Sequence, residues 1–220
     1  MILRSPQLAA LGWLDHGFGT RLAPPDWPDR HYVNLRQIHS DVVMRAGGEA
    51  CSPSGVFGEG DGLVTNQPEL WLGIRTADCA PVILADPAHR AAAVVHAGWR
   101  GTVNSILART LERMKADFGT RPQDLVAAIG PTIGPCCFEV GEEVARQFIP
   151  WWPERTDLDS GRAMIDLAGT LRLQLTAAGL EPVNVAAIGE CTRCQAGRYH
   201  SFRRDREASG RMVSAVRIRA

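Results

Sequence analysis

The stretch "AAAVVHAGWRGT" (residues 91–102) joins an apolar run to a turn that carries unusual chemistry. Its first seven residues are apolar apart from His96, and such a run is typical of a strand that is covered on both faces. Two glycines then enclose Trp99 and Arg100. A turn that only reversed the chain would need neither an indole nor a guanidinium, so we expect these groups to serve a site.

Other strands and helices are predicted around this stretch. Apolar runs predict strands at 62–65, 70–76, 81–86, 91–97, 124–130, 183–189 and 212–219. Apolar residues at spacings of three and four predict a helix from 103 to 114, ended by Gly119, and another over 164–178. Residues 141–149 begin with acidic side chains and are predicted to be helical. This order predicts an α/β (α+β) fold, a sandwich of mixed β-sheets flanked by helices.

The composition is that of an ordinary globular protein. Of 220 residues, 45% are hydrophobic and 22% are charged, which argues against disorder. Lys+Arg and Asp+Glu both number 24, and the lack of a basic excess disfavours a nucleic-acid partner. We identify no signal peptide and no apolar run that could cross a bilayer, so we expect a cytoplasmic protein without a membrane partner. Two loops are predicted, at 20–31 and 51–62, and one domain is expected over residues 1–220.

Six cysteines are too few for a disulfide scaffold in a chain of this length. They lie at positions 51, 79, 136, 137, 191 and 194. Cys191 and Cys194 form a C-x-x-C, but we recognise no second pair that would complete a four-cysteine zinc site. Cys136 and Cys137 are adjacent and seldom suited to disulfide geometry, so we expect one to be buried and the other to lie near the surface.

Three candidate metal ligands occur at strand ends or turns. They are His39 in "RQIHSD", Cys79 in "RTADCAP" and His96 in "VVHAGWRG". Two imidazoles and a thiolate are a known zinc set, and three protein ligands leave a fourth position for water or substrate. Two other interpretations stay open: each residue is structural, or Cys79 is a nucleophile with His96 as its base.

Several segments resemble, in the same order, the signatures of the YfiH family. They are "HGFGTR", "QIHSD", "RTADCAPVILAD", "VVHAGWRGT", "IGPTIGPCCFEVGEEV" and "YHSFRRDREASGRM". Members of that family are also called laccase-domain proteins, polyphenol oxidases, purine nucleoside phosphorylases or peptidoglycan-editing factor. The resemblance implies one compact α/β sandwich with a metal in a surface cleft, and its zinc ligands map onto His39, Cys79 and His96.

The sequence departs from the family pattern between Arg21 and Gln37. About fifteen residues separate these two positions, whereas most members carry a longer segment with a G-G-x-S-like turn, an N-L-G stretch and a helix. No implied ligand lies in the shortened N-terminal segment, so we expect metal binding to be retained. One wall of the substrate cleft is expected to be missing or rebuilt.

The resemblance implies phosphorolysis of purine nucleosides such as adenosine, inosine and methylthioadenosine, and it also implies adenosine deamination. The implied cofactor is Zn²⁺, with Cu²⁺ as a competitor for the same ligands. Phosphate requires cationic donors, preferably arginines. The candidates are Arg21, Arg75, Arg100, Arg203 and Arg204. Arg100 is favoured because its glycine neighbours let the backbone approach a ligand, although ordinary ion pairs are expected for at least half of the five.

Gln37 and Asp78 flank the candidate ligands and are predicted to orient metal-bound imidazoles. Asp78 is an equally good candidate for capping a turn.

Two alternative activities follow from the family's other names. A copper-dependent, laccase-like polyphenol oxidase would need a multicopper cluster with many imidazoles, and the chain has six histidines in all. An amidase that edits peptidoglycan precursors is chemically compatible with the same metal or with Cys79. A non-catalytic module with a structural zinc would need a fourth ligand, and none is recognised near these motifs.

Overall fold

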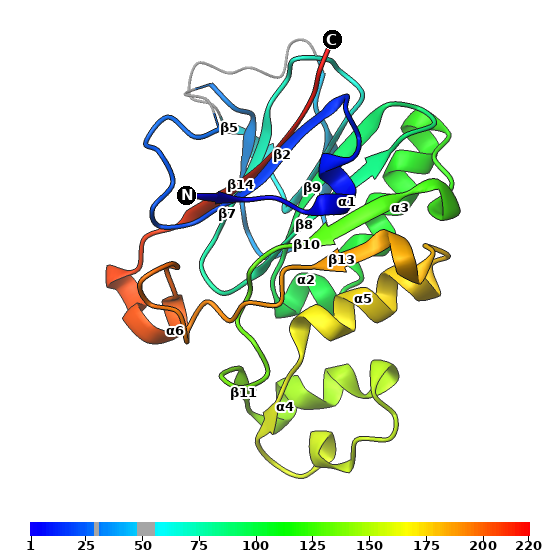
Figure 1. Ribbon diagram of the computed structural model, residues 1–220. Coiled ribbons are helices and arrows are strands. Elements are labelled where there is room, and N and C mark those ends of the chain that lie inside the picture. Colours follow the sequence, from blue (N-terminus) through cyan, green and yellow to red (C-terminus); the bar gives the residue numbers. More distant parts are fainter. Residues whose placement is uncertain (29–30, 48–55) are drawn as a thin grey trace.

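The computed structural model describes most of the chain in three layers. The described residues are 1–28, 31–47 and 56–220. The predicted loop at 20–31 lies within this part except for residues 29–30, and the predicted loop at 51–62 is described from residue 56 onward. Cys51 lies outside the described residues. A four-stranded sheet packs on a six-stranded sheet, whose other face is covered by helices (Figure 1).

The six-stranded sheet is mixed and forms the middle layer. Its order is β13 (Val185–Ala187), β10 (Val126–Ile129), β8 (Ala80–Asp86), β9 (Ala91–Ala97), β6 (Gly62–Thr65) and β4 (Val43–Arg45). The outer pairs β13–β10 and β6–β4 are parallel, and the inner pairs are antiparallel. Every residue of β8 and β9 is buried, as the continuous apolar runs predict.

The four-stranded sheet is antiparallel throughout. Its order is β1 (Ile2–Leu3), β2 (Leu14–Gly19), β14 (Met212–Ile218) and β7 (Leu72–Thr76). Two small pairs complete the strands: β3 (Asn34–Arg36) with β5 (Val56–Glu59), and β11 (Glu139–Val140) with β12 (Ala163–Met164). The sequence predicts β7 and β14 but not β1 or β2, because β2 reads "LDHGFG" and shows no apolar alternation.

Successive side chains of the central strands point to opposite faces of the middle sheet, so a hydrophobic core forms on each face. Val82 and Leu84 of β8 pack toward the helices, while Ile83 packs against the four-stranded sheet. On β9, Val94 lies on the same side as Ile83. His96 shares that side of β9, one residue before the strand ends.

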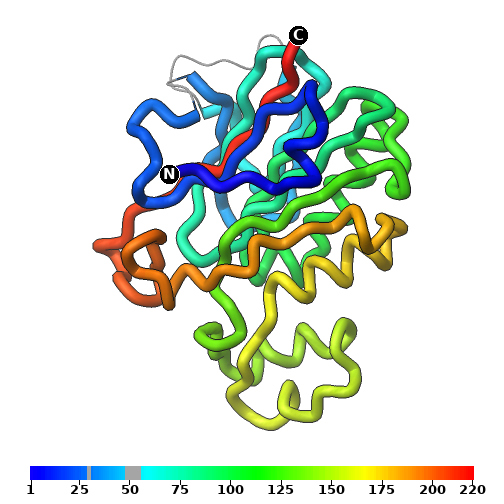
Figure 2. Tube along the Cα trace, in the orientation of Figure 1, coloured from blue at the N-terminus to red at the C-terminus, as the bar shows by residue number. Residues whose placement is uncertain are grey.

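Two long helices cover the outer face of the middle sheet. They are α3 (Ile106–Phe118) and α5 (Leu167–Ala177) (Figures 1 and 2). A short helix, α2 (Trp99–Val103), precedes α3, and the two are separated at Ser105, whose φ is +63°. The predicted helix over 103–114 is therefore confirmed as α3 with a break at its start, and it ends at Gly119 as predicted.

The other predicted helices are shorter than expected. α5 begins at Leu167, where Asp166 accepts a hydrogen bond from the Gly169 N–H, because residues 163–164 are taken into β12. Residues 141–149 form α4 (Glu142–Ala145) and then a 3₁₀ turn. The remaining α-helices among the described residues are α1 (Pro6–Ala9) and α6 (Phe202–Asp205). No helix in the described part of the chain is long and apolar enough to cross a membrane.

Candidate metal centre

Three donor atoms from separate segments meet at one end of the two central strands of the middle sheet. A ring nitrogen from each of His39 and His96 and the Sγ of Cys79 lie within 4.8 Å of one another. Cys79 directly precedes β8 and His96 lies near the end of β9. Because these strands are antiparallel, with Ala80 opposite Ala97, the start of one and the end of the other lie side by side. His39 follows β3, and its ring centroid lies 5.0 Å from that of His96.

A fully buried carboxylate, Asp61, holds two of these donors in place. One of its oxygens lies 2.7 Å from Nδ1 of His96 and accepts the backbone N–H of His39 at 3.1 Å. The other accepts the N–H groups of Ile38 and Ser40 and the Ser40 hydroxyl, at 3.3, 2.6 and 2.7 Å. A carboxylate on one imidazole nitrogen leaves the other for a metal, a common arrangement in metal sites.

The ionisation of Cys79 and His96 is strongly coupled. Burial disfavours the thiolate, but the neighbouring imidazoles of His96 and His39 outweigh burial and lower the pKa of Cys79 to about 6. Burial likewise disfavours imidazolium, but the facing Cys79 and Asp61 raise the pKa of His96 to about 9. The sulfur is therefore ready to act as a thiolate, the form that binds metals and also the form that attacks as a nucleophile.

The start of α2 lies directly against the donors. A Cβ added at Gly98 would lie 3.0 Å from the Cys79 sulfur and 3.2 Å from Cδ2 of His39. A Cβ at Gly101 would lie 3.0 Å from the carbonyl oxygen of Ser40. The donor types, the buried carboxylate and this close backbone approach together fit a bound metal ion.

The donors lie in a cleft of about 840 Å³. Two of the predicted arginines, Arg75 on β7 and Arg203 on α6, line this cleft. Two arginines that were not predicted, Arg36 and Arg211, also line it. Its apolar lining includes Ile133, Phe138 and Phe202.

Arg203 and Arg75 differ in how they are held. The Arg203 guanidinium lies 5.5 Å from the Phe138 ring centroid and donates to the Glu139 carbonyl at 2.8 Å. The Arg75 side chain is exposed, and among the described residues its guanidinium makes no hydrogen bond or ion pair. Two cationic groups in the cleft thus retain donors for an anion.

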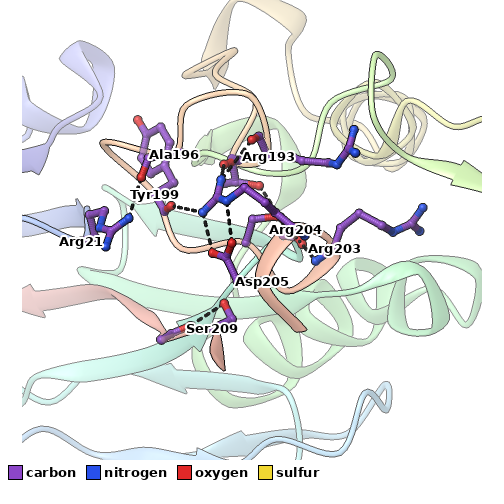
Figure 3. Close-up of polar contacts among 12 residues, drawn as sticks. Arg21, Arg193, Ala196, Tyr199, Arg203, Arg204, Asp205 and Ser209 are labelled. Carbon is purple, nitrogen blue, oxygen red and sulfur yellow. Dashed lines mark hydrogen bonds and ion pairs between the residues drawn. The ribbon is translucent and has the colours of Figure 1, made fainter. Parts of the chain in front are cut away.

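The other predicted arginines do not line the cleft. The Arg204 guanidinium donates to the carbonyl oxygens of Thr192, Arg193 and Tyr199 and pairs with Asp205 (Figure 3). Arg21 donates to the carbonyl of Ala196 at 2.7 Å (Figure 3). Both therefore hold the 192–199 loop in place.

Arg100 and Trp99 are also outside the cleft lining. The exposed Arg100 lies over the Trp99 ring at 4.4 Å, and Trp99 packs against the core between sheet and helices. The glycines thus bring the backbone, rather than these two side chains, close to the donors.

The two residues predicted to orient the imidazoles make other contacts. Gln37 exchanges hydrogen bonds of 2.8 and 2.7 Å with the backbone of Arg75. Asp78 accepts from the Thr192 hydroxyl, the Ser201 hydroxyl and the Arg203 N–H, at 2.6, 3.0 and 2.6 Å.

Asp78 therefore ties the turn before Cys79 to the C-terminal segment, while Asp61 orients His96. Asp61 was missed because it lies in a predicted loop. The pairing of Gly62 with Val95 brings it beside His96.

The expectation that the C-x-x-C has no second pair is wrong. The sulfur atoms of Cys136, Cys137, Cys191 and Cys194 all lie within 4.8 Å of one another. The parallel pairing of β10 with β13 explains this, because the segments after parallel strands leave the sheet at the same edge. As predicted, Cys137 is buried and Cys136 is exposed.

Residues 22–219 match the family described as multi-copper polyphenol oxidoreductase laccase. The chain belongs to this family. The crystal structure of the hypothetical protein YfiH from Bacillus licheniformis superposes on this chain with a TM-score of 0.85 at 26% identity, covering 94% of each chain. The predicted resemblance and fold class are confirmed.

Relatives of this chain, including the two that follow, carry names of enzymes. A "Purine nucleoside phosphorylase" from Deinococcus radiodurans is 40% identical over 190 residues, covering 84% of this chain and 69% of its own length. An "Adenosine deaminase RL5" from an unknown prokaryotic organism is 37% identical over 161 residues, covering 71% of this chain and 61% of its own length.

Proposed function

We propose that this chain is a zinc-dependent purine nucleoside phosphorylase. The observation that carries the proposal is a single cleft that holds a three-donor metal set together with arginines that have free donors. The relative named purine nucleoside phosphorylase supports the substrate class. His39, Cys79 and His96 would hold the ion.

The reaction determines what the cleft must do. Phosphorolysis breaks the C–N bond between ribose and purine and forms a C–O bond between the same carbon and phosphate. The phosphate must therefore be held against the sugar, and the charge that develops on the departing base must be stabilised. When bound, the zinc supplies a Lewis acid that polarises a substrate oxygen.

Arg75 and Arg203 are the proposed phosphate-binding residues. Each presents a planar fork of N–H donors that matches two phosphate oxygens. The contact of Arg203 with Phe138 and the Glu139 carbonyl restricts its guanidinium before phosphate arrives, which reduces the entropy lost on binding. Phe138 and Phe202 offer apolar surface to a purine.

Asp61 acts on the donors rather than on the substrate. Its hydrogen bonds fix the His96 ring and the backbone of His39, so the donor positions are set before a ligand binds. Asp78 fixes the turn before Cys79 by accepting hydrogen bonds from the segment that carries Arg203. The metal donors and the phosphate donors are therefore mechanically connected.

Adenosine deamination is the second candidate, favoured by the relative named adenosine deaminase. It replaces the amino group of adenine with oxygen from water and needs no phosphate. Purified protein is incubated with adenosine in phosphate and in phosphate-free buffer, and products are separated by chromatography. Phosphorolysis yields adenine and ribose 1-phosphate only in the phosphate buffer, whereas deamination yields inosine in both buffers. If adenosine is consumed in neither buffer, both candidate activities are contradicted.

Phenol oxidation at copper is tested separately. In the described part of the chain, two groups could hold a metal, and one has two imidazoles while the other has none. Copper would therefore bind as a substitute for zinc at the His–Cys–His site. A blue or coupled-copper absorption band with turnover of a phenol would support the oxidase instead.

A further inference from the structure

Four cysteines outside the cleft bring their sulfur atoms together. Cys194 Sγ lies 3.4 Å from Cys137 Sγ and 3.7 Å from Cys136 Sγ, and Cys191 completes a set within 4.8 Å. A tetrahedral zinc with Zn–S bonds of about 2.3 Å separates its sulfurs by about 3.8 Å. The observed spacings therefore suit one ion bound by all four sulfurs.

We propose that these four cysteines bind a second metal ion, a structural Zn²⁺. The site shares no residue with the His39–Cys79–His96 centre. Four thiolates fill a tetrahedral shell and leave no position for substrate, as in structural rather than catalytic zinc sites. The proposal goes beyond phosphorolysis and does not depend on it.

Groups around the cluster compensate negative charge on sulfur. The backbone N–H of Gly134 donates to Cys191 Sγ at 3.2 Å, and an Arg193 N–H donates to Cys137 Sγ at 3.5 Å. A zinc ion with four thiolates carries a net charge of about −2, so a guanidinium and N–H donors beside it stabilise the complex. Cys136 and Cys194 are exposed, which gives the ion a path of entry.

The cluster joins two turns that both contact Asp78, a residue that lines the cleft. Thr132 and Thr192, one beside each cysteine pair, donate to the Asp78 backbone oxygen and carboxylate, both at 2.6 Å. Phe138 follows Cys137 directly and lines the cleft. A zinc ion here would fix the two turns against each other and thereby hold the wall beside Cys79.

Metal analysis of the full chain tests the proposal. Protein purified with zinc under reducing conditions is expected to hold two zinc ions per chain. Cys194→Ser and Cys79→Ser are each expected to retain one, and the double variant none. Cys194→Ser is further expected to lower the thermal midpoint and raise KM for the nucleoside, since it loosens the cleft wall while leaving the His–Cys–His donors in place.

A thiol count on the wild-type chain keeps the test independent of any variant. After unfolding without reductant, at least the five cysteines proposed to bind metal, out of six in the sequence, are expected to react with a thiol reagent, since metal-bound cysteines are not oxidised. Fewer than five reactive thiols with one zinc per chain would show a disulfide in place of the ion. One zinc in the wild type and none in Cys79→Ser would likewise overturn the proposal. Inactivity with two bound zinc ions would refute phosphorolysis but leave this site intact.

Discussion

Replacing Asp61 with asparagine removes one charge without changing the size of the side chain. The carboxylate accepts five hydrogen bonds, two at one oxygen and three at the other. Each oxygen faces two N–H donors: His39 and His96 on one side, Ile38 and Ser40 on the other. In either orientation, the asparagine amide would therefore point its own N–H groups at two donors.

The expected cost follows from those unmatched donors. A buried donor without an acceptor costs about 1–3 kcal/mol, so Asp61→Asn should lower the free energy of unfolding by about 2–6 kcal/mol. The His96 ring also loses the partner that fixes its orientation. Loss of such a partner commonly lowers metal affinity by about 10- to 100-fold.

Asp86→Asn is a matched control. Asp86 is fully buried, contacts His89 Nδ1 at 2.9 Å and accepts two backbone N–H groups, but it lies at the far end of β8 from Cys79. Urea unfolding should show both variants destabilised, whereas competition with a chelator should show weakened metal binding in Asp61→Asn alone. Equal metal affinities in the two variants would refute the role given to Asp61.

Three further outcomes are expected. Gly98→Ala should weaken metal binding at least about tenfold, because its Cβ would lie 3.0 Å from the Cys79 sulfur, whereas Gly12→Ala, with nothing within 4 Å, should not. Burial, aided by a nearby arginine, lowers the pKa of His16 to about 4. Between pH 6.5 and 4, His16 in the unfolded chain therefore binds a proton that it does not bind in the folded chain. The free energy of unfolding should fall by up to about 3 kcal/mol as the pH drops through this range. Urea titrations of His16→Gln should lack this pH-dependent loss. Arg75→Met should raise KM for phosphate about tenfold with little change in kcat, and an unchanged KM would remove Arg75 from the phosphate site.

The central strands could be predicted because they are buried on both faces. β6, β8 and β9 read as continuous apolar runs with clear ends, and the structure confirms them. β2 could not be predicted, because the close approach of other segments, rather than a local pattern, requires glycine at two of its positions. A Cβ at Gly17 would lie 2.4 Å from Ile2, and one at Gly19 would lie 2.6 Å from the Val213 carbonyl. Such contacts are absent from local sequence patterns.

The candidate site was predictable in its donor types but not in its support. His39, Cys79 and His96 stand out because imidazoles and a thiol occur at strand ends or turns. Asp61 becomes visible once β6 is paired with β9, because its backbone carbonyl accepts the His96 N–H at 2.7 Å. The four-cysteine cluster likewise depends on the parallel pairing of β10 with β13, which no spacing along the chain reveals.

The most direct test of the account is the rate of adenine release from adenosine in phosphate, measured for the zinc-loaded wild type and for Cys79→Ser. The account predicts adenine and ribose 1-phosphate in equal amounts from the wild type, with a loss of at least about 100-fold in the variant, which lacks one of three metal ligands. Adenine release that persists at the wild-type rate in Cys79→Ser, or that needs no phosphate, would contradict it.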